Sequence, residues 1–273
     1  MDDAVQKQLL RTLNQAIEKF TPAAPKTLYH YTTPEACFAI LNGKSTEGEP
    51  SVWASSAFCM NDASEIFYGS GVVGQVAAKF GPAGEDLLEQ EFRYLETAMV
   101  VSFSSDPDLL SQWRAYARNG AGCAIGFDRD RLCAAAEGQS FRLIPVVYDP
   151  KIQHDILVEF FERAEGPWPM VLAAASLLAL SFKNRGFQEE VEWRLAAPAS
   201  AKVLFRSGPS GVIPYTTLLL MKDCITEIWQ GPTLDQEMAG RAWDFYLRSE
   251  YGENTAGESR VRLHSSTLPL RLL

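Results

Sequence analysis

Four short segments of this chain carry side chains that could do chemistry, and the first is LYHYTT, residues 28–33. One of only three histidines lies here between two tyrosines. Side chains alternate between the two faces of a strand, so His30 and Thr32 are predicted to share one face and Tyr29 and Tyr31 the other. Two interpretations of His30 stay open: a strand histidine satisfied by its neighbours, or one that binds a ligand.

The second segment is MNDASE, residues 60–65. Asn61 or Asp62, followed by Glu65, is the pattern that caps the start of a helix. The alternative is that this helix start faces a phosphate group, because its first backbone N–H groups have no partner within the helix.

The third segment spans residues 100–128. Ser102 and Ser104 are two residues apart in a predicted strand, so both hydroxyls lie on one face. Trp113 and Tyr116 are one helical turn apart, so they border the same space, either a ligand site or the core. The glycine-rich run NGAGCAIG allows a close approach to a ligand or to another element, but it matches neither a dinucleotide fingerprint nor a P-loop.

The fourth segment is QEEVEWRL, residues 188–195. Glu190, Glu192 and Arg194 alternate along a predicted strand and are expected to point the same way. Two neighbouring carboxylates can hold the hydroxyl pair of a ribose or stabilise a developing cation, while the arginine limits their mutual repulsion. An edge strand with a solvated charged face has the same pattern. The alternate side chains are predicted to face the core: Val191, Trp193 and Leu195.

The elements that position these segments follow from periodicity and turn residues. Helices are predicted at residues 3–20, 33–44, 60–80, 108–120, 151–185 with a break near 166–167, and 233–249. Strands are predicted at residues 27–32, 51–56, 97–105, 122–128, 141–149, 189–198, 201–205 and 226–232. This irregular alternation predicts an α+β fold, a mixed and mostly antiparallel sheet flanked by helices. We expect an N-terminal helix over residues 1–24 and one domain over 25–273, including a strand–helix extension from about residue 207.

Composition excludes several classes of protein. With 25 basic and 34 acidic residues the formal charge is −9, which disfavours a broad nucleic-acid-binding face. The five cysteines form no C-x-x-C pair, so a zinc or disulfide framework is disfavoured and a reducing cytoplasm is expected. The most apolar run, residues 171–182, is too short to span a bilayer, and no signal-peptide core is recognised. We therefore expect a cytoplasmic protein with no membrane partner.

Together and in this order, the four segments resemble the bacterial domain-of-unknown-function family 2971. They correspond to its YHYT-like start, its NDxxE segment, its SFS-like strand with a following Trp, Tyr-Ala and glycine-rich strand, and its E-x-E-x-R segment. EIWQGP at residues 227–232 and the tail HSSTLPLR extend the resemblance to residues 27–271. Membership of this family does not by itself imply a function.

The chain is also similar, more distantly, to the ADP-ribosyltransferase superfamily, and this likeness implies NAD as substrate. Those enzymes hold NAD with a His or Arg on a first strand, a Tyr or Ser-x-Ser on a second, and a Glu, sometimes in E-x-E, on a later one. The resemblance implies that His30, Glu190 and Glu192 are catalytic, with Glu192 preferred because it lies deeper in its strand. It places these residues around NAD: Tyr31, Thr32, Asn61, Ser102, Ser104, Trp113, Tyr116 and Arg194.

The sequence leaves three candidate functions open. The first is transfer of ADP-ribose from NAD to an unknown macromolecular target, or NAD glycohydrolysis, in defence or stress response; it needs no metal and requires His30 and Glu192 to line one pocket. The second is a nucleotide- or nucleic-acid-sensing module without turnover. The third is a hydrolase or nuclease that holds a divalent ion with acidic side chains. Those carboxylates are Asp62, Glu65, Glu190 and Glu192.

Overall fold

The computed structural model describes residues 3–43, 49–59, 64–82, 95, 97–198, 202–208 and 211–269. Its strands are β1 (Thr27–Thr32), β2 (Ser51–Ser56), β3 (Ala98–Ser104), β4 (Cys123–Asp128), β5 (Arg142–Pro145), β6 (Glu192–Pro198), β7 (Leu204–Gly208), β8 (Gly211–Leu219), β9 (Ile225–Gln230) and β10 (Arg262–Ser265). Its α-helices are α1 (Asp3–Phe20), α2 (Pro34–Asn42), α3 (Ser64–Ala77), α5 (Leu110–Ala115), α6 (Arg129–Glu137), α7 (Pro150–Arg163), α8 (Trp168–Ser176) and α9 (Gln236–Tyr251). Five 3₁₀ turns complete them: η1 (Ala57–Cys59), η2 (Arg118–Gly120), η3 (Leu177–Ser181), η4 (Arg185–Glu190) and η5 (Lys222–Cys224).

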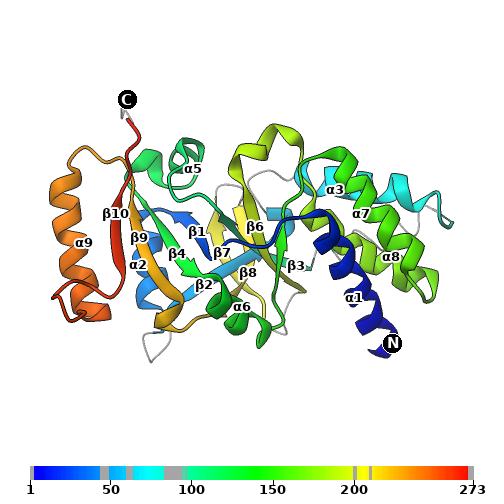
Figure 1. Cartoon of the computed structure of the whole chain (residues 1–273), viewed down its shortest axis with the longest axis horizontal. Helices are drawn as coiled ribbons and strands as arrows, with labels where there is room; N and C mark the ends of the chain where they lie inside the picture. Colours follow the sequence, from blue (N-terminus) through cyan, green and yellow to red (C-terminus); the bar gives the residue numbers. More distant parts are fainter. Residues whose placement is uncertain are drawn as a thin grey trace.

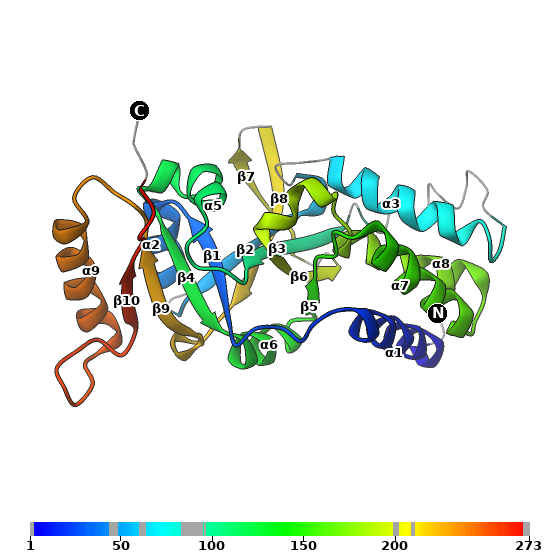
Figure 2. The ribbon, with the colours of Figure 1, turned by 45° about the horizontal axis from the view of Figure 1, so that its top comes forward.

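A ten-stranded sheet runs through the molecule in the order β10-β9-β4-β1-β3-β2-β8-β7, with β6 also paired to β3 and β5 to β6. The named strands pair antiparallel except β9 and β10, which are parallel. Helices α1, α3, α7 and α8 gather at one end of the sheet, and α9 covers the other (Figures 1 and 2). The predicted α+β class with a mixed, mostly antiparallel sheet is confirmed.

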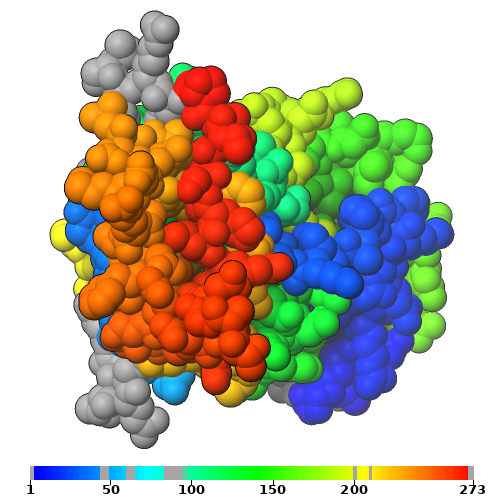
Figure 3. Space-filling view, turned by 60° about the vertical axis from the view of Figure 1, so that its left-hand side comes forward, coloured from blue at the N-terminus to red at the C-terminus, as the bar shows by residue number. Residues whose placement is uncertain are grey.

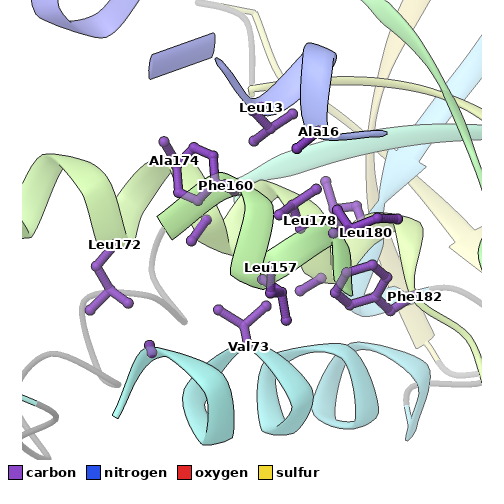
Figure 4. Packing of buried hydrophobic residues seen from close by; sticks show 14 of the residues in the cluster. Leu13, Ala16, Val73, Leu157, Phe160, Leu172, Ala174, Leu178, Leu180 and Phe182 are labelled. Atoms are coloured by element: carbon purple, nitrogen blue, oxygen red, sulfur yellow. The ribbon is translucent and has the colours of Figure 1, made fainter. Parts of the chain in front are cut away.

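The helical end has its own apolar core. The buried face of α1 packs against α7 and α8, and Leu13, Val73 and Phe160 from three helices point toward one another (Figure 4). The apolar run at residues 171–182 forms most of α8 and η3 inside this core. Among the described helices, none is long and apolar enough to cross a membrane.

The start of the second helix shows how local chemistry sets the boundaries. Thr33 caps α2 by accepting a hydrogen bond from the Ala36 N–H, and Pro34 occupies the first turn, where no N–H is needed. Gly43 ends the helix at φ +59°, and a Cβ there would lie 1.8 Å from the Glu49 carbonyl oxygen. This predicted helix and its two boundaries are confirmed.

The C-terminal end differs from prediction by one strand. The helix expected at 233–249 is α9, and the tail after it returns as β10 beside β9. Figure 3 shows α9 and this segment next to each other on one face. The sequence pattern also missed α6 and β8, because α6 has a weak apolar stripe and β8 contains a proline, a glycine and two threonines.

Several predicted elements are wrong in extent. The strand expected at 141–149 ends at Pro145, and the strand expected at 201–205 is β7 at 204–208. Two further differences bear on the site. The helix at 108–120 ends at Ala115, after which Arg118 and Asn119 adopt positive φ values of 46° and 52°. The strand at 189–198 begins only at Glu192, because residues 185–190 form a 3₁₀ turn and Val191 has φ +42°. Val191 is therefore exposed, not in the core, whereas Leu195 is fully buried and Trp193 half-buried.

Candidate functional site

A cleft opens where the sheet splits beside β3. One edge of β3 pairs along its whole length with β6. Its other edge pairs with β1 only at Ser104 and with β2 only at Met99 and Val100, so β1 and β2 diverge across its middle. A cavity of about 610 Å³ lies at this split, lined by side chains from β1, β2, β3 and the segments before β6. This volume is in the range of small-molecule sites.

His30 reaches the part of β3 that has no strand partner on this edge. Its Nδ1 lies 2.9 Å from the Ser102 carbonyl oxygen. A carbonyl only accepts, so Nδ1 carries the proton and Nε2 of the neutral ring is an acceptor. Burial lowers the pKa of His30, against the opposing effect of the hydrogen bond to Ser102, so the neutral form is favoured. Among the described residues, Nε2 has no hydrogen-bond partner.

The two interpretations of His30 concern different atoms of the ring: the structural one applies to Nδ1, and the ligand-binding one now concerns Nε2. Nδ1 satisfies a backbone carbonyl that the split leaves without a strand partner, which is a structural role. The ring also packs edge-on against Phe103, with centroids 5.9 Å apart, and this contact restricts its orientation. Since His30 lines the cleft, the second nitrogen is the atom that a ligand could use.

Five charged side chains form a buried group beside the cleft, here called the ion cluster: Glu65, Lys183, Glu190, Glu192 and Arg194. The Lys183 Nζ contacts all three carboxylates, at 2.8 Å from Glu65, 2.5 Å from Glu190 and 3.1 Å from Glu192. Arg194 binds both oxygens of Glu192, at 2.7 and 2.9 Å, and Glu65 at 2.6 Å. It also donates to the Leu180 carbonyl at 2.9 Å.

The two carboxylates predicted to be catalytic have opposite pKa shifts. Burial alone would raise the pKa of Glu192, but the charge and hydrogen bonds of Arg194 and the charge of Lys183 outweigh it and lower this pKa to about 2. For Glu190 burial dominates, and the pKa is raised despite the hydrogen bond from Lys183. Glu192 is therefore held ionised, while Glu190 binds a proton more readily than an ordinary glutamate.

The cross-strand register explains how separate motifs meet. Ser102 is directly opposite Arg194, and Ser104 opposite Glu192, so these four side chains share one face of the β3–β6 pair. The Ser102 side chain helps to lower the pKa of the Glu192 carboxyl, and the Ser104 hydroxyl donates to the Glu190 carbonyl at 2.9 Å. Glu190 reaches Lys183 from the end of η4, not from the strand, so the predicted alternation is wrong although the carboxylates do converge.

The predicted site residues divide into three groups. Those that line the cleft are His30, Tyr31, Thr32, Ser102, Ser104, Tyr116, Glu190 and Glu192. Trp113 and Arg194 are buried behind it; Trp113 packs edge-on against Tyr31, with ring centroids 4.7 Å apart. Asn61 and Asp62 lie outside the described residues, as does the predicted phosphate contact at this helix start.

The sequence pattern did not predict the roles of three side chains of the site. Lys183 follows the apolar run at 171–182 directly, and a cation at the end of a buried run was the available signal. Glu65 was assigned to helix capping, yet its carboxylate binds Lys183 and Arg194. Arg206 lines the cleft from β7, and no motif marked it.

The glycine-rich segment has a structural role. A Cβ on Gly122 would lie 2.1 Å from the Thr32 carbonyl oxygen, and one on Gly126 would lie 2.5 Å from a side-chain carbon of Glu227. These glycines let β4 approach β1 and accommodate Glu227, which accepts a 2.6 Å hydrogen bond from the Tyr29 hydroxyl. The close approach is therefore to other elements of the fold.

Ser266 and Thr267 of the tail motif hold the loop between β3 and α5. Asp108 accepts hydrogen bonds from the Trp113 indole at 2.8 Å, from the Ser266 hydroxyl at 2.5 Å and from the Thr267 N–H at 3.0 Å. The same loop contacts the Tyr31 hydroxyl, which donates to the Asp106 carbonyl at 2.8 Å. The C-terminal segment thus fixes the loop between β3 and α5.

The acidic side chains of the ion cluster converge on an ammonium group. Lys183 occupies the position between Glu65, Glu190 and Glu192 that a divalent cation would need. Within the part of the chain that the structure describes, no group of three or more His, Cys, Asp or Glu side chains has the arrangement of a metal site.

Comparison with models of protein families identifies a match over part of the chain. A family model described as Protein of unknown function (DUF2971) matches residues 112–195, which supports the predicted resemblance over this segment. The segment starts in α5 and ends in β6, so it contains Tyr116, Lys183 and the E-x-E-x-R motif. No curated protein and no solved structure matches the chain.

Proposed function

We propose that the cleft binds NAD and that the protein is an ADP-ribosyltransferase-like enzyme that transfers ADP-ribose to a macromolecule, or an NAD glycohydrolase. The observation that carries this proposal is the pair Glu190 and Glu192, with opposite pKa shifts, on the same cleft as His30. Two carboxylates with pKa values pushed apart can take two different roles in one reaction. The strands behind them, β6, β3 and β1, are neighbours in the sheet, in support of the more distant resemblance.

The reaction breaks the bond between the ribose C1′ and the nicotinamide nitrogen, and the electron pair leaves with nicotinamide. The positive charge of the pyridinium ring is lost from the leaving group and develops on the ribose. Glu192, held ionised by Arg194, is suited to stabilise that charge electrostatically. The acceptor, a target side chain or water, then forms the new bond at C1′ and loses a proton, which Glu190 takes up.

The other lining residues position the substrate. The unpartnered Nε2 of His30 accepts a hydrogen bond from a ribose hydroxyl. The ring of Tyr116 lines the cleft on the side of α5 and can stack on nicotinamide. Tyr31 is a weaker candidate for stacking, because its ring is packed against Trp113 and its hydroxyl is engaged by the loop.

The first test is thermal shift with NAD combined with release of free nicotinamide. The matched variants are Glu190→Gln and Glu189→Gln, since Glu189 is adjacent and exposed. We expect NAD to stabilise the wild type and Glu189→Gln, and we expect Glu190→Gln and His30→Ala to lose about a hundredfold or more of the nicotinamide release. Glu192→Gln is compared at a temperature well below its own melting point, because it also disturbs the ion cluster.

Two other outcomes of these measurements would favour the alternative functions, a sensing module or a metal-dependent enzyme. NAD binding that survives in Glu192→Gln, with no nicotinamide release from any variant, favours a sensing module. A melting temperature that rises with Mg²⁺ or Mn²⁺ and not with NAD favours a metal-dependent hydrolase or nuclease. If NAD changes neither the melting temperature nor the nicotinamide concentration, the proposal is refuted.

A further inference from the structure

The charged side chains of the cleft form ion pairs on one side, whereas on the other side an arginine has no ion-pair partner among the described residues. On the β6 side, Glu65, Glu190 and Glu192 are paired with Lys183 and Arg194. On the β2 side, the charged group is Arg206, which lines the same cleft. Within the described residues, no carboxylate lies within ion-pair distance of Arg206.

Arg206 is held in place by neutral contacts. It lies on β7 opposite Ile213 of β8, and β8 pairs with β2, so its guanidinium reaches over this hairpin to the cleft. One terminal nitrogen donates to the Ser55 hydroxyl at 3.0 Å, and the guanidinium carbon lies 5.8 Å from the centre of the Trp53 ring. These contacts orient the cation without neutralising it.

One donor of this arginine is both shielded and unsatisfied. The Nε of Arg206 is buried from solvent and has no hydrogen-bond partner in the part of the chain that the structure describes. A buried donor without a partner is costly, and guanidinium groups match the oxygen atoms of phosphate with two parallel bonds. Trp53 lines this side of the cleft and packs at a tilt against Tyr215, with ring centroids 4.7 Å apart.

We propose that Arg206 is the anion-binding residue of the cleft and that it holds the phosphate or diphosphate group of a nucleotide ligand. If the proposed function is right, that group is the diphosphate of NAD, whose positively charged nicotinamide ring then faces the carboxylates on the β6 side. The two sides of the cleft thus match a ligand that is cationic at one end and anionic in its middle.

The test is isothermal titration calorimetry with three probes: ADP-ribose, which has a diphosphate, nicotinamide riboside, which has none, and inorganic pyrophosphate. We expect Arg206→Gln to weaken binding of ADP-ribose and pyrophosphate by about tenfold to a hundredfold and to leave nicotinamide riboside unchanged, since one charge-assisted hydrogen-bonding group is removed. Arg206→Lys should keep part of the affinity. Arg241→Gln, an exposed arginine on α9, is the control and should bind like the wild type.

The outcomes separate this inference from the proposed function. If pyrophosphate binds the wild type but not Arg206→Gln, and no nicotinamide is released from NAD, the anion site is supported and the proposed transferase or glycohydrolase function is refuted. If nicotinamide is released and Arg206→Gln binds ADP-ribose as tightly as the wild type, the function stands and the anion site is refuted. If neither diphosphate probe binds the folded wild type, the anion site is also refuted.

Discussion

Replacement of Arg194 by methionine tests the central claim that the ion cluster is one interdependent unit. The arginine is 2% exposed and donates to Glu192, Glu65 and the Leu180 carbonyl. With all groups ionised, three carboxylates face two cations, so the cluster has a net charge of −1, and Arg194→Met makes it −2. Two buried carboxylates then lose their closest cation.

The expected cost is large because breaking a buried ion pair leaves an uncompensated charge. Removal of one partner typically destabilises by about 3–5 kcal/mol. For a chain of this size, that corresponds to a decrease in Tm of about 6–20 °C. The double variant Glu192→Leu/Arg194→Met should be more stable than Arg194→Met alone, because one of the two carboxylates that faced the guanidinium is removed with it. The other, Glu65, keeps its contact with Lys183 at 2.8 Å.

The assay is urea unfolding followed by circular dichroism, at constant pH and ionic strength. The control is Arg241→Met, whose 80% exposed side chain pairs with Glu237 one helical turn away, and it should change the free energy of unfolding by at most about 0.5 kcal/mol. An Arg194→Met loss no larger than that of the control would refute the reasoning. So would a double variant whose loss equals the sum of the two single losses.

Two further predictions concern the walls of the cleft. In ¹⁵N NMR of the imidazole rings, the signals that disappear in His30→Ala identify His30. These signals should show the Nδ1–H tautomer and a pKa below 6.5. A ring that titrates at or above that pH would contradict the buried geometry. Because the folded-state pKa of His30 is lowered, its contribution to stability is present above pH 6.5 and is lost as the pH falls through the lowered pKa. Asp108→Ala should cost about 1–3 kcal/mol and speed amide exchange at residues 266–268, because it leaves the donors of Trp113 and Ser266 without their acceptor. Asp130→Ala, at an 80% exposed aspartate, is the control, and equal exchange in both variants would refute the role of Asp108.

The local signals in the sequence determined most of the elements before β4. Thr33, Pro34 and Gly43 define α2 through capping, a missing N–H and a positive φ, and all three effects act within a few residues. Alternation likewise placed His30 and Thr32 on one face of β1. Such features need no knowledge of distant contacts, because their physical causes lie in neighbouring backbone groups.

Local sequence signals predicted only part of the candidate site. The resemblance to ADP-ribosyltransferases grouped His30, Ser102 and Glu192 around one ligand, and in the structure these three residues line one cleft. The assumed strand through Glu190 was wrong, because Val191 adopts a left-handed conformation that local alternation does not reveal. Glu190 nevertheless meets Lys183, since the ammonium attracts it from outside the strand.

What only the tertiary structure decided is the chemistry of each charged group. Glu65 lies more than a hundred positions before Lys183 and Arg194 in the sequence. The sequence therefore does not tell which carboxylate is held ionised. That depends on burial and on the distances among five side chains from α3, β6 and the turns before it. Arg206 is cationic in any fold, but its missing partner becomes visible only once β7, β8 and β2 are side by side. Electrostatic roles are set by three-dimensional neighbours, which spacing along the chain does not specify.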